Sequence, residues 1–240
     1  MPGFAERRFG FLPASTLKLI ACIFMAIDHI GAYFFPGTIW LRIVGRISYP
    51  IFAYLIAEGC TYTRNKLKRL LLLLIPGLLF DAVYIIIFKR HYGNIFLTFS
   101  LSIVLIYGLQ WLKSAFSEGN RKKTLLALIV FLGLVGGVWL VNREYHVEYG
   151  VYGILVPVFA AFFEGEENRD IRLFSFSAGL VLLSVKMGIS NIQVWSLMSV
   201  PVLALYNGKA GTRKYKYGFY IFYPVHLMLI WCIGWIMQNV

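Results

Sequence analysis

Two neighbouring apolar stretches of the chain contain ionisable side chains that a hydrocarbon environment disfavours. The first, LKLIACIFMAIDHIGAYFF, contains Asp28 and His29, and the second, IWLRIVGRISYPIFAYLIAEG, contains Arg42, Arg46 and Glu58. A charge at the bilayer centre costs at least about 2.5–3.5 kcal/mol, so such residues usually face the protein interior and have a function. Histidine accepts a proton near neutral pH, and arginine binds anions and carboxylates. The pattern therefore predicts acid–base chemistry beside an anionic or acyl-carbonyl group.

Helical spacing places the adjacent residues Asp28 and His29 on different faces of the first predicted helix. Lys18, Cys22 and His29 share one helix face, and Asp28 lies on the adjacent stripe together with Ala21. Neighbouring residues on a helix do not face each other, so we expect Asp28 to pair with an arginine of the second stretch and not with His29. The alternative is a purely structural ion pair next to a hydrogen-bonded core histidine.

The second stretch places its two arginines on one helix face. Arg42, Arg46 and Tyr49 follow helical spacing, and Pro50 is expected to break or kink the helix. The alternative for the arginines is that their side chains extend to the membrane interface. Glu58 lies near the other end of the stretch. Its alternative explanation is a structural ion pair with the basic loop that follows it.

A second intramembrane histidine, His226, lies in the last apolar stretch, within Tyr-Pro-Val-His. We expect it to meet His29 if the helices close into a bundle, whereas His91 and His146 fall in loops as ordinary surface residues. The sequence has no hydrolase elbow, no phosphate-binding glycine loop and no HExxH pair. Two histidines without a matching set of carboxylates do not make a metal site, so we expect no metal.

Membrane helices are expected to hold these residues in place. The chain has 240 residues, of which 59% are hydrophobic and 14% charged, and its mean hydropathy is +0.71. Soluble domains are about 25% charged, and apolar runs of about 20 residues match the hydrocarbon thickness of a bilayer. We therefore expect an all-α, polytopic transmembrane bundle forming a single domain over residues 1–240. About nine spans are predicted, at 17–35, 39–60, 70–88, 94–112, 124–141, 149–163, 171–187, 192–206 and 217–237.

The net charge of +12 indicates membrane orientation and not a nucleic-acid partner. Of the 23 Lys and Arg residues, 17 fall on the side of the N-terminus, 4 fall on the opposite side, and Arg42 and Arg46 lie within a span. Positive residues concentrate in cytoplasmic loops. The distribution predicts a cytoplasmic N-terminus and a C-terminus on the outer face.

Several segments together resemble the TraX family, whose namesake is the conjugative F-pilin acetylase. They are LKLIACIFMAIDHIG, LRIVGRISYPIFAYLIAEGCTYT, NIFLTFSL, EYGVYGIL, LYNGKAG and KYKYGFYIFYPVHLMLI. The family is similar in logic to membrane acyltransferases of the bacterial envelope. Family members often have an aspartate at the position of Glu148. The resemblance implies transfer of an acetyl group from acetyl-CoA, and the matching positions are Asp28, His29, Arg42, Arg46, Glu58 and His226.

From the residues and the resemblance together we expect an acetyltransferase in the bacterial inner (plasma) membrane. Acetyl-CoA, a co-substrate and not a tightly bound cofactor, would donate from the cytosol to an outer acceptor: a pilin-like protein or peptide amine, or an envelope glycan hydroxyl. His29 would act as general base or transient acyl carrier, Arg46 and Arg42 would stabilise the oxyanion, Asp28 would hold them, and His226 would assist proton transfer.

We expect a basic mouth on the cytoplasmic side to attract the phosphates of the donor. Its residues are Arg64, Lys66, Lys68, Arg69, Lys214 and Lys216, and Glu58 is a further candidate for binding the donor. The alternative is that these cations only orient the protein in the membrane. Two other functions stay open: a small transporter or channel with an intramembrane charge relay, and an assembly factor of an envelope complex.

Overall fold

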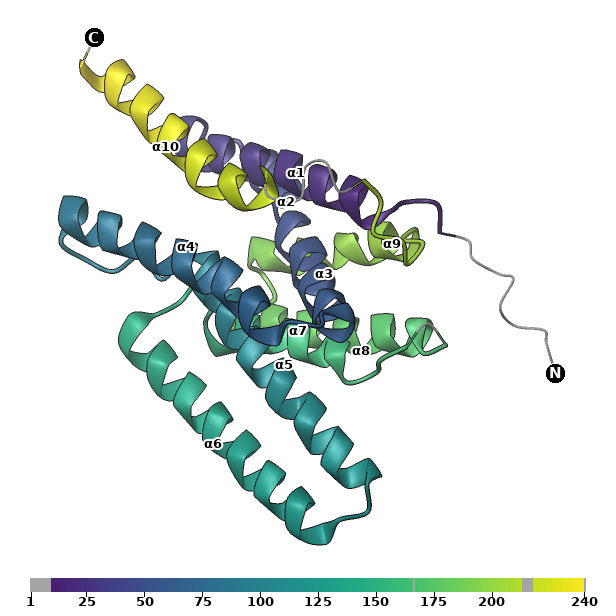
Figure 1. The fold of residues 1–240 in the computed structure, drawn as a ribbon. Helices are drawn as coiled ribbons and strands as arrows, with labels where there is room; N and C mark the ends of the chain where they lie inside the picture. Colours follow the sequence, from purple (N-terminus) through teal and green to yellow (C-terminus); the bar gives the residue numbers. More distant parts are fainter. Residues whose placement is uncertain (1–9, 166, 213–217, 240) are drawn as a thin grey trace. The chain divides into compact units, whose positions relative to one another are not determined.

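The structure is a computed structural model, and it describes residues 10–165, 167–212 and 218–239. These residues are largely helical, and Leu12 and Tyr206 form an isolated bridge (Figure 1). The helices are α1 (Ala14–Phe34), α2 (Ile39–Gly45), α3 (Ser48–Tyr62), α4 (Lys66–Phe88), α5 (Ile95–Ser117), α6 (Arg121–Tyr145), α7 (Gly150–Ala161), α8 (Arg169–Met187), the 3₁₀ helix η1 (Ile192–Met198), α9 (Ser199–Ala204) and α10 (Gly218–Asn239).

Six segments of the described chain are long and apolar enough to cross a membrane. They are α1, α2 with α3, α4, α5, α6 and α10. The all-α, multi-pass prediction is therefore confirmed, whereas three of the nine predicted spans do not reach this length and hydropathy. The helix α7 has 12 residues, the apolar segment Ile192–Ala204 is short as well, and α8 contains Arg169, Asp170, Arg172 and Lys186. The number of crossings and their orientation stay predictions.

The helix of the second stretch is interrupted before its proline. The helix α2 ends at Gly45 and α3 begins at Ser48, so the break lies at residues 46–47. Pro50 lies in the first turn of α3, where the lack of an N–H group removes no intrahelical hydrogen bond. The prediction that Pro50 breaks or kinks the helix is therefore corrected: a break is present, but Pro50 begins the new helix.

The chain divides into two compact units, and the division falls within α3. Unit 1 comprises Met1–Leu55 and Gly165–Val240, and unit 2 comprises Ile56–Glu164. The single domain over residues 1–240 stays a prediction.

In unit 1, α1, α8 and α10 all begin at one end, which we call the α1-start end. There Ala14 N–H donates to the Lys209 carbonyl at 2.8 Å, and the Arg169 guanidinium donates to the Ala204 carbonyl at 2.7 Å. Lys18 Nζ lies 5.6 Å from the ring centre of Phe219, so α10 starts beside the start of α1 and packs along it (Figure 1). The connecting segments α2–α3 and η1–α9 return toward this end.

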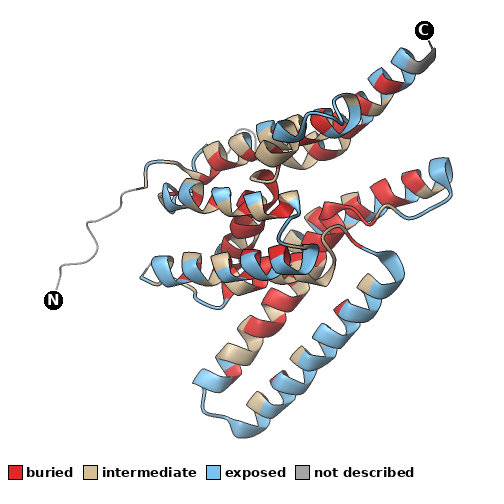
Figure 2. Ribbon diagram, turned by 180° about the vertical axis from the view of Figure 1, so that it is seen from behind, coloured by how far each residue is buried: buried red, intermediate tan, exposed pale blue. Residues whose placement is uncertain are grey.

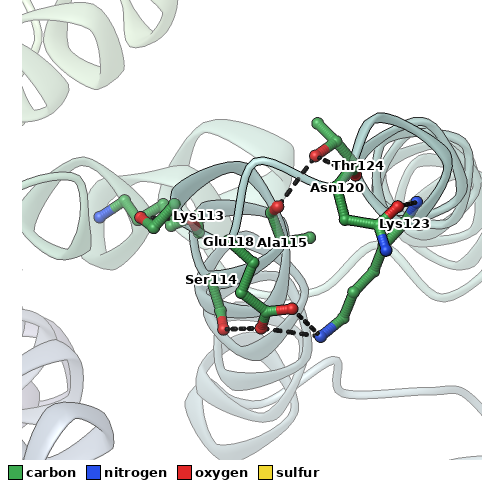
Figure 3. A network of polar contacts seen from close by, with 8 residues as sticks. Lys113, Ser114, Ala115, Glu118, Asn120, Lys123 and Thr124 are labelled. Carbon is green, nitrogen blue, oxygen red and sulfur yellow. Dashed lines mark hydrogen bonds and ion pairs between the residues drawn. The ribbon is translucent and has the colours of Figure 1, made fainter.

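In unit 2, α5 is the central helix, and it packs against α4, α6 and α7. Most of its residues are buried, whereas α6 exposes most of its length (Figure 2). Polar contacts close the turn between α5 and α6 (Figure 3). Asn120 caps α6 by accepting from Lys123 N–H at 3.1 Å, and the Thr124 hydroxyl donates to the Ala115 carbonyl at 3.0 Å.

Candidate functional site

The two intramembrane histidines of unit 1 are in direct contact. His29 Nδ1 and His226 Nε2 are 2.8 Å apart, and their ring centres are 5.0 Å apart. His226 is buried, and His29 is partly buried. The ring of Phe222 stacks on His226 with an interplanar angle of 9°. The contact between α1 and α10 that the sequence predicts on condition of a closed bundle is therefore present.

A backbone carbonyl determines which nitrogen of this pair can accept a proton. His226 Nδ1 lies 2.8 Å from the Phe222 carbonyl oxygen, which can only accept a hydrogen bond. In the neutral ring Nδ1 then carries the proton, and Nε2 of His226 is an acceptor. His29 Nδ1–H donates to that acceptor, so the lone pair of His29 resides on Nε2. The geometry gives His29 a defined basic nitrogen.

Asp28 bridges the two arginines of the second stretch. Its Oδ2 atom accepts from Arg46 Nη2 and lies 3.1 Å from Arg42 Nη1, which also donates to the Asp28 backbone carbonyl at 3.1 Å. Asp28 is buried, whereas the Arg42 side chain is 27% exposed. The predicted pairing of Asp28 with an arginine of the second stretch is thus present in the geometry.

Close packing of α1 on α2 makes this ion cluster possible. A side chain at Gly45 would collide with the side chain of Asp28, so only glycine leaves room for the carboxylate there. On the next helix the Ser48 hydroxyl donates to the Ala21 carbonyl at 2.8 Å and joins α3 to α1. Small residues at such contacts let helix backbones approach each other within a membrane.

The cluster carries a net positive charge beside the His29 imidazole. Two guanidinium groups and one carboxylate leave one positive charge, which favours an anion or an oxyanion in a low-dielectric interior. His29 follows Asp28 directly in α1, and its basic Nε2 can accept a proton. These groups suit a reaction that removes a proton and develops negative charge on oxygen.

The described residues of the predicted basic mouth lie in unit 2. In unit 2, Arg69 Nη2 donates to the Ile56 carbonyl at 2.9 Å, and Lys66 Nζ lies 5.0 Å from the ring centre of Tyr107. Glu58 is buried in the same unit, and Arg64 and Lys68 are exposed. Lys214 and Lys216 lie outside the described residues. The mouth stays a prediction, and the contact of Arg69 indicates a structural task for this residue.

The interpretation of His91 as an ordinary surface residue misses a specific contact. His91 Nδ1 lies 2.8 Å from Oδ2 of the buried Asp81, whose Oδ1 accepts from the Tyr92 backbone N–H at 2.8 Å. This pair fastens the loop between α4 and α5. An aspartate within an apolar run was the available signal for a partner. His146 is exposed, as predicted.

Hydrogen bonds of the Glu148 backbone connect it to two other segments of unit 2. The Glu148 carbonyl accepts from the Thr98 hydroxyl at 2.9 Å, and its N–H donates to the Gly93 carbonyl. Tyr149, which follows, has a φ of 61° at the start of α7. These two hydrogen bonds are made by backbone atoms of Glu148, so an aspartate there would preserve them.

Comparison with known proteins matches the chain to one family. The family model for the TraX protein matches residues 14–234. A "probable fimbrial assembly protein FimC, serogroup H1" of Dichelobacter nodosus is 26% identical over 90% of this chain and 93% of its own length. An uncharacterized protein of Rickettsia prowazekii (strain Madrid E) is 26% identical over 68% of this chain and 60% of its own length. No solved structure matches the chain.

Proposed function

The chain belongs to the TraX family, and from this membership we propose that this multi-pass membrane protein is an acetyltransferase. The donor is cytosolic acetyl-CoA, and the acceptor is an amine or hydroxyl on the far side of the bacterial inner membrane. The single observation that carries the proposal is the hydrogen-bonded pair of His29 and His226 beside the Asp28–arginine cluster.

His29 is the general base of the proposed reaction. As the acceptor nitrogen or oxygen attacks the thioester carbonyl carbon, its proton moves to His29 Nε2. The tetrahedral intermediate collapses, the carbon–sulfur bond breaks, and the thiolate of CoA leaves. The proton on His29 then passes to that thiolate, so the products are the acetylated acceptor and CoA thiol. His226 Nε2 accepts the hydrogen bond of His29 Nδ1–H throughout the reaction. This bond keeps the Nε2 atom of His29 directed away from His226.

The same pair also supports a covalent route. His29 Nε2 attacks the thioester carbonyl carbon, the carbon–sulfur bond breaks, and the acetyl group stays on the imidazole. The Nδ1 proton of the acylated ring moves to His226 Nε2, which lies 2.8 Å away. Attack by the acceptor then transfers the acetyl group, the proton on His226 Nε2 returns to His29 Nδ1, and the acceptor proton passes to the thiolate.

Arg46 and Arg42 stabilise the oxyanion of the tetrahedral intermediate in both routes. A preorganised donor of this kind is typically worth about 100–1000-fold in rate. Asp28 holds the two guanidinium groups in one arrangement before substrate binds, so no reorganisation is needed during the reaction.

A pilin-type amine is the acceptor that the relatives favour. The relative from Dichelobacter nodosus is named for fimbrial assembly, and its similarity covers nearly the whole of both chains. We therefore propose a pilin-like protein or peptide as the acceptor, with a glycan hydroxyl as the other chemical class.

The test is acetyl transfer by the purified full-length protein in nanodiscs, with radiolabelled acetyl-CoA and a synthetic pilin N-terminal peptide. We expect labelled peptide with the wild type and with His146→Asn, and a loss of roughly 100-fold or more with His29→Asn. The two variants carry the same substitution, one in the histidine pair and one on the exposed loop. Full transfer by His29→Asn would refute the histidine mechanism.

The printed name of the relative also favours a second function, an assembly factor without catalysis. In that case His29→Asn would leave pilus assembly in cells unchanged. A transporter with an intramembrane charge relay is distinguished by ligand binding, because only an acetyltransferase should gain thermal stability from acetyl-CoA at sub-millimolar concentration. Binding of a ligand to the folded state raises the melting temperature by mass action.

A further inference from the structure

The side of η1 that is turned into unit 1 is polar. Gln193 and Ser196 are its buried residues, Ser199 at the start of α9 continues the row, and Trp195 and Met198 are exposed. A 3₁₀ helix has three residues per turn, so residues three apart lie one above the other. The three polar side chains therefore form a row, which we call the η1 row. Its inward polar side is the reverse of what a helix on a soluble protein shows.

The side chains of the η1 row have no hydrogen-bond partners within the described part of the chain. This holds for Oε1 and Nε2 of Gln193 and for the hydroxyl oxygens of Ser196 and Ser199. The Ser184 hydroxyl lies 3.4 Å from the Gln193 backbone carbonyl, which leaves the side-chain amide unused. Buried amides and hydroxyls in natural proteins are almost always paired, so the row lacks a partner that these residues do not supply.

A buried arginine lies at the α1-start end of the same unit. Arg172 is 3% exposed, and its guanidinium carbon lies 5.1 Å from the ring centre of Tyr54. Its Nε and Nη2 atoms are buried without a hydrogen-bond partner, and no ion pair neutralises the charge among the residues that the structure describes. A buried unpaired charge is strongly unfavourable, and the guanidinium geometry matches a phosphate. Arg172 therefore suits an anionic ligand.

Arg172 and the η1 row lie along one path beside α8, which leads toward α2. The segment η1–α9 runs antiparallel to α8: Gln193 contacts Ser184, and Ala204 contacts Arg169. Ser184 lies twelve residues, about 18 Å, beyond Arg172 along α8. The helix η1 also packs against α2, which carries Arg42. The row thus leads from the end that holds Arg172 toward the helix that supplies the arginine cluster.

We propose that Arg172 and the η1 row form the binding site for the acyl donor, a subsite that rests on the proposed function. Arg172 holds a phosphate of acetyl-CoA, and Ser199, Ser196 and Gln193 hydrogen-bond the amides and hydroxyl of its extended arm. A side-chain amide and two hydroxyls can donate to and accept from peptide-like amides. A molecule with an anion at one end and amides along an arm satisfies all of these unpaired atoms.

Two ligands separate the anion contact from the arm contact. Binding is measured by calorimetry on the full-length protein in nanodiscs, with acetyl-CoA and with S-acetyl-pantetheine, which lacks phosphate. We expect Arg172→Gln to weaken acetyl-CoA binding roughly tenfold or more and to leave S-acetyl-pantetheine binding unchanged. The matched control is Arg169→Gln, on the same helix but only partly buried and bonded to a backbone carbonyl, which should change neither affinity.

Substitutions in the η1 row should affect the binding of both ligands, unlike substitution of Arg172. We expect Gln193→Leu and Ser199→Ala to weaken binding of both ligands roughly threefold to tenfold. Ser199→Ala should also raise the melting temperature of the ligand-free protein, because it removes a buried unpaired hydroxyl. Its control is Ser177→Ala, since the Ser177 hydroxyl donates to the Leu173 carbonyl at 2.8 Å.

The outcomes distinguish this inference from the proposed function. Wild-type binding of acetyl-CoA with unchanged affinity in Arg172→Gln and Gln193→Leu overturns the subsite and leaves the acetyltransferase intact. Equal losses of both ligands in Arg172→Gln overturn the anion contact. A wild type that binds neither ligand contradicts the proposed function and the subsite with it. If Arg172→Gln does not fold, Arg172→Lys keeps the charge and should weaken only acetyl-CoA.

Discussion

The chain of hydrogen bonds from the Phe222 carbonyl through His226 to His29 determines the reactivity of this site at the level of single residues. A carbonyl cannot donate, so the direction of both bonds is fixed for the neutral pair. In many enzymes a carboxylate orients the catalytic imidazole. In the proposed mechanism a second histidine takes that place, and it introduces no negative charge into an apolar environment.

The first prediction concerns the orienting histidine. His226→Ala should lower kcat for acetyl transfer by roughly 10–100-fold, because His29 loses the acceptor that fixes its tautomer. His226→Gln should recover part of this loss, since its amide oxygen can accept from His29 Nδ1–H. Steady-state kinetics of both variants provide the measurement. Equal activity of the alanine and glutamine variants would argue against an orienting role.

The ion cluster yields a second prediction, on stability. Arg46→Met should destabilise the protein by about 3–5 kcal/mol, because it removes the more buried partner of the Asp28 carboxylate. Arg42→Met should cost about 1 kcal/mol, since its side chain is 27% exposed. Reversible unfolding in mixed micelles measures both values. The double variant Asp28→Asn/Arg46→Met should cost less than the sum of its parts, and strict additivity would show that the pair is not coupled.

Helix packing is the element-level condition for this cluster, and Gly45 is its test. Gly45→Ala should destabilise the protein by about 1–3 kcal/mol and lower acetyl transfer, because its methyl group displaces Asp28. Gly133→Ala in α6 is the control, since open space surrounds that position and alanine favours a helix. The outcome against this packing would be equal stability and activity in the two variants, measured by unfolding and by transfer assay.

The turn between α5 and α6 gives a pH-dependent prediction (Figure 3). A hydrogen bond from Lys123 lowers the pKa of the Glu118 carboxyl, and Lys123 Nζ lies 2.6 Å from Glu118 Oε2. Because the folded pKa is depressed, this contribution is present above the pKa of about 4.3 for unfolded Glu and is lost as pH falls through the folded value. The protection of backbone amides at the start of α6, taken as the exchange rate relative to the intrinsic rate at each pH, should therefore fall in acid, and Glu118→Gln should remove this dependence. If the variant keeps the same acid dependence, that dependence comes from a titratable group other than Glu118.

The sequence predicts charged features of the helices better than neutral ones. The contacts of Asp28 and His29 were predictable because a charge or imidazole in an apolar run must find a partner. The interruption between α2 and α3 was placed at Pro50, since only the backbone reveals that helix formation stops earlier. Arg172 stands near the start of the predicted span 171–187, where a basic residue is typical of a flanking loop, so the sequence does not predict its burial.

The η1 row escaped prediction for a related reason. Gln193, Ser196 and Ser199 are neutral, and they lie in a short segment whose composition is mainly apolar. Their spacing of three forms a single row only in a 3₁₀ helix. An α-helix of the same sequence would spread them around its axis by about 60° for each step of three. The burial of the polar side thus depends on the 3₁₀ conformation of the backbone, which the amino-acid composition does not predict.

At the scale of the whole molecule, the proposed reaction requires that acetyl groups cross the bilayer. The excess of basic residues on the side of the N-terminus predicts which face meets cytosolic acetyl-CoA. In unit 1 the helices α1, α8 and α10 begin at one end, and the segment η1–α9 runs back to that end. This arrangement agrees with a chain whose successive membrane segments run in opposite directions. A site held between such helices can receive a donor from one face and an acceptor from the other.

The most direct measurement is vectorial transfer in sealed proteoliposomes. Labelled acetyl-CoA is added outside, and a pilin N-terminal peptide is enclosed in the lumen. We expect labelled peptide in the lumen with the wild type and with His146→Asn, and none above background with His29→Asn. Labelling by His29→Asn at the wild-type rate, or an unlabelled peptide with folded wild-type protein, would contradict the account.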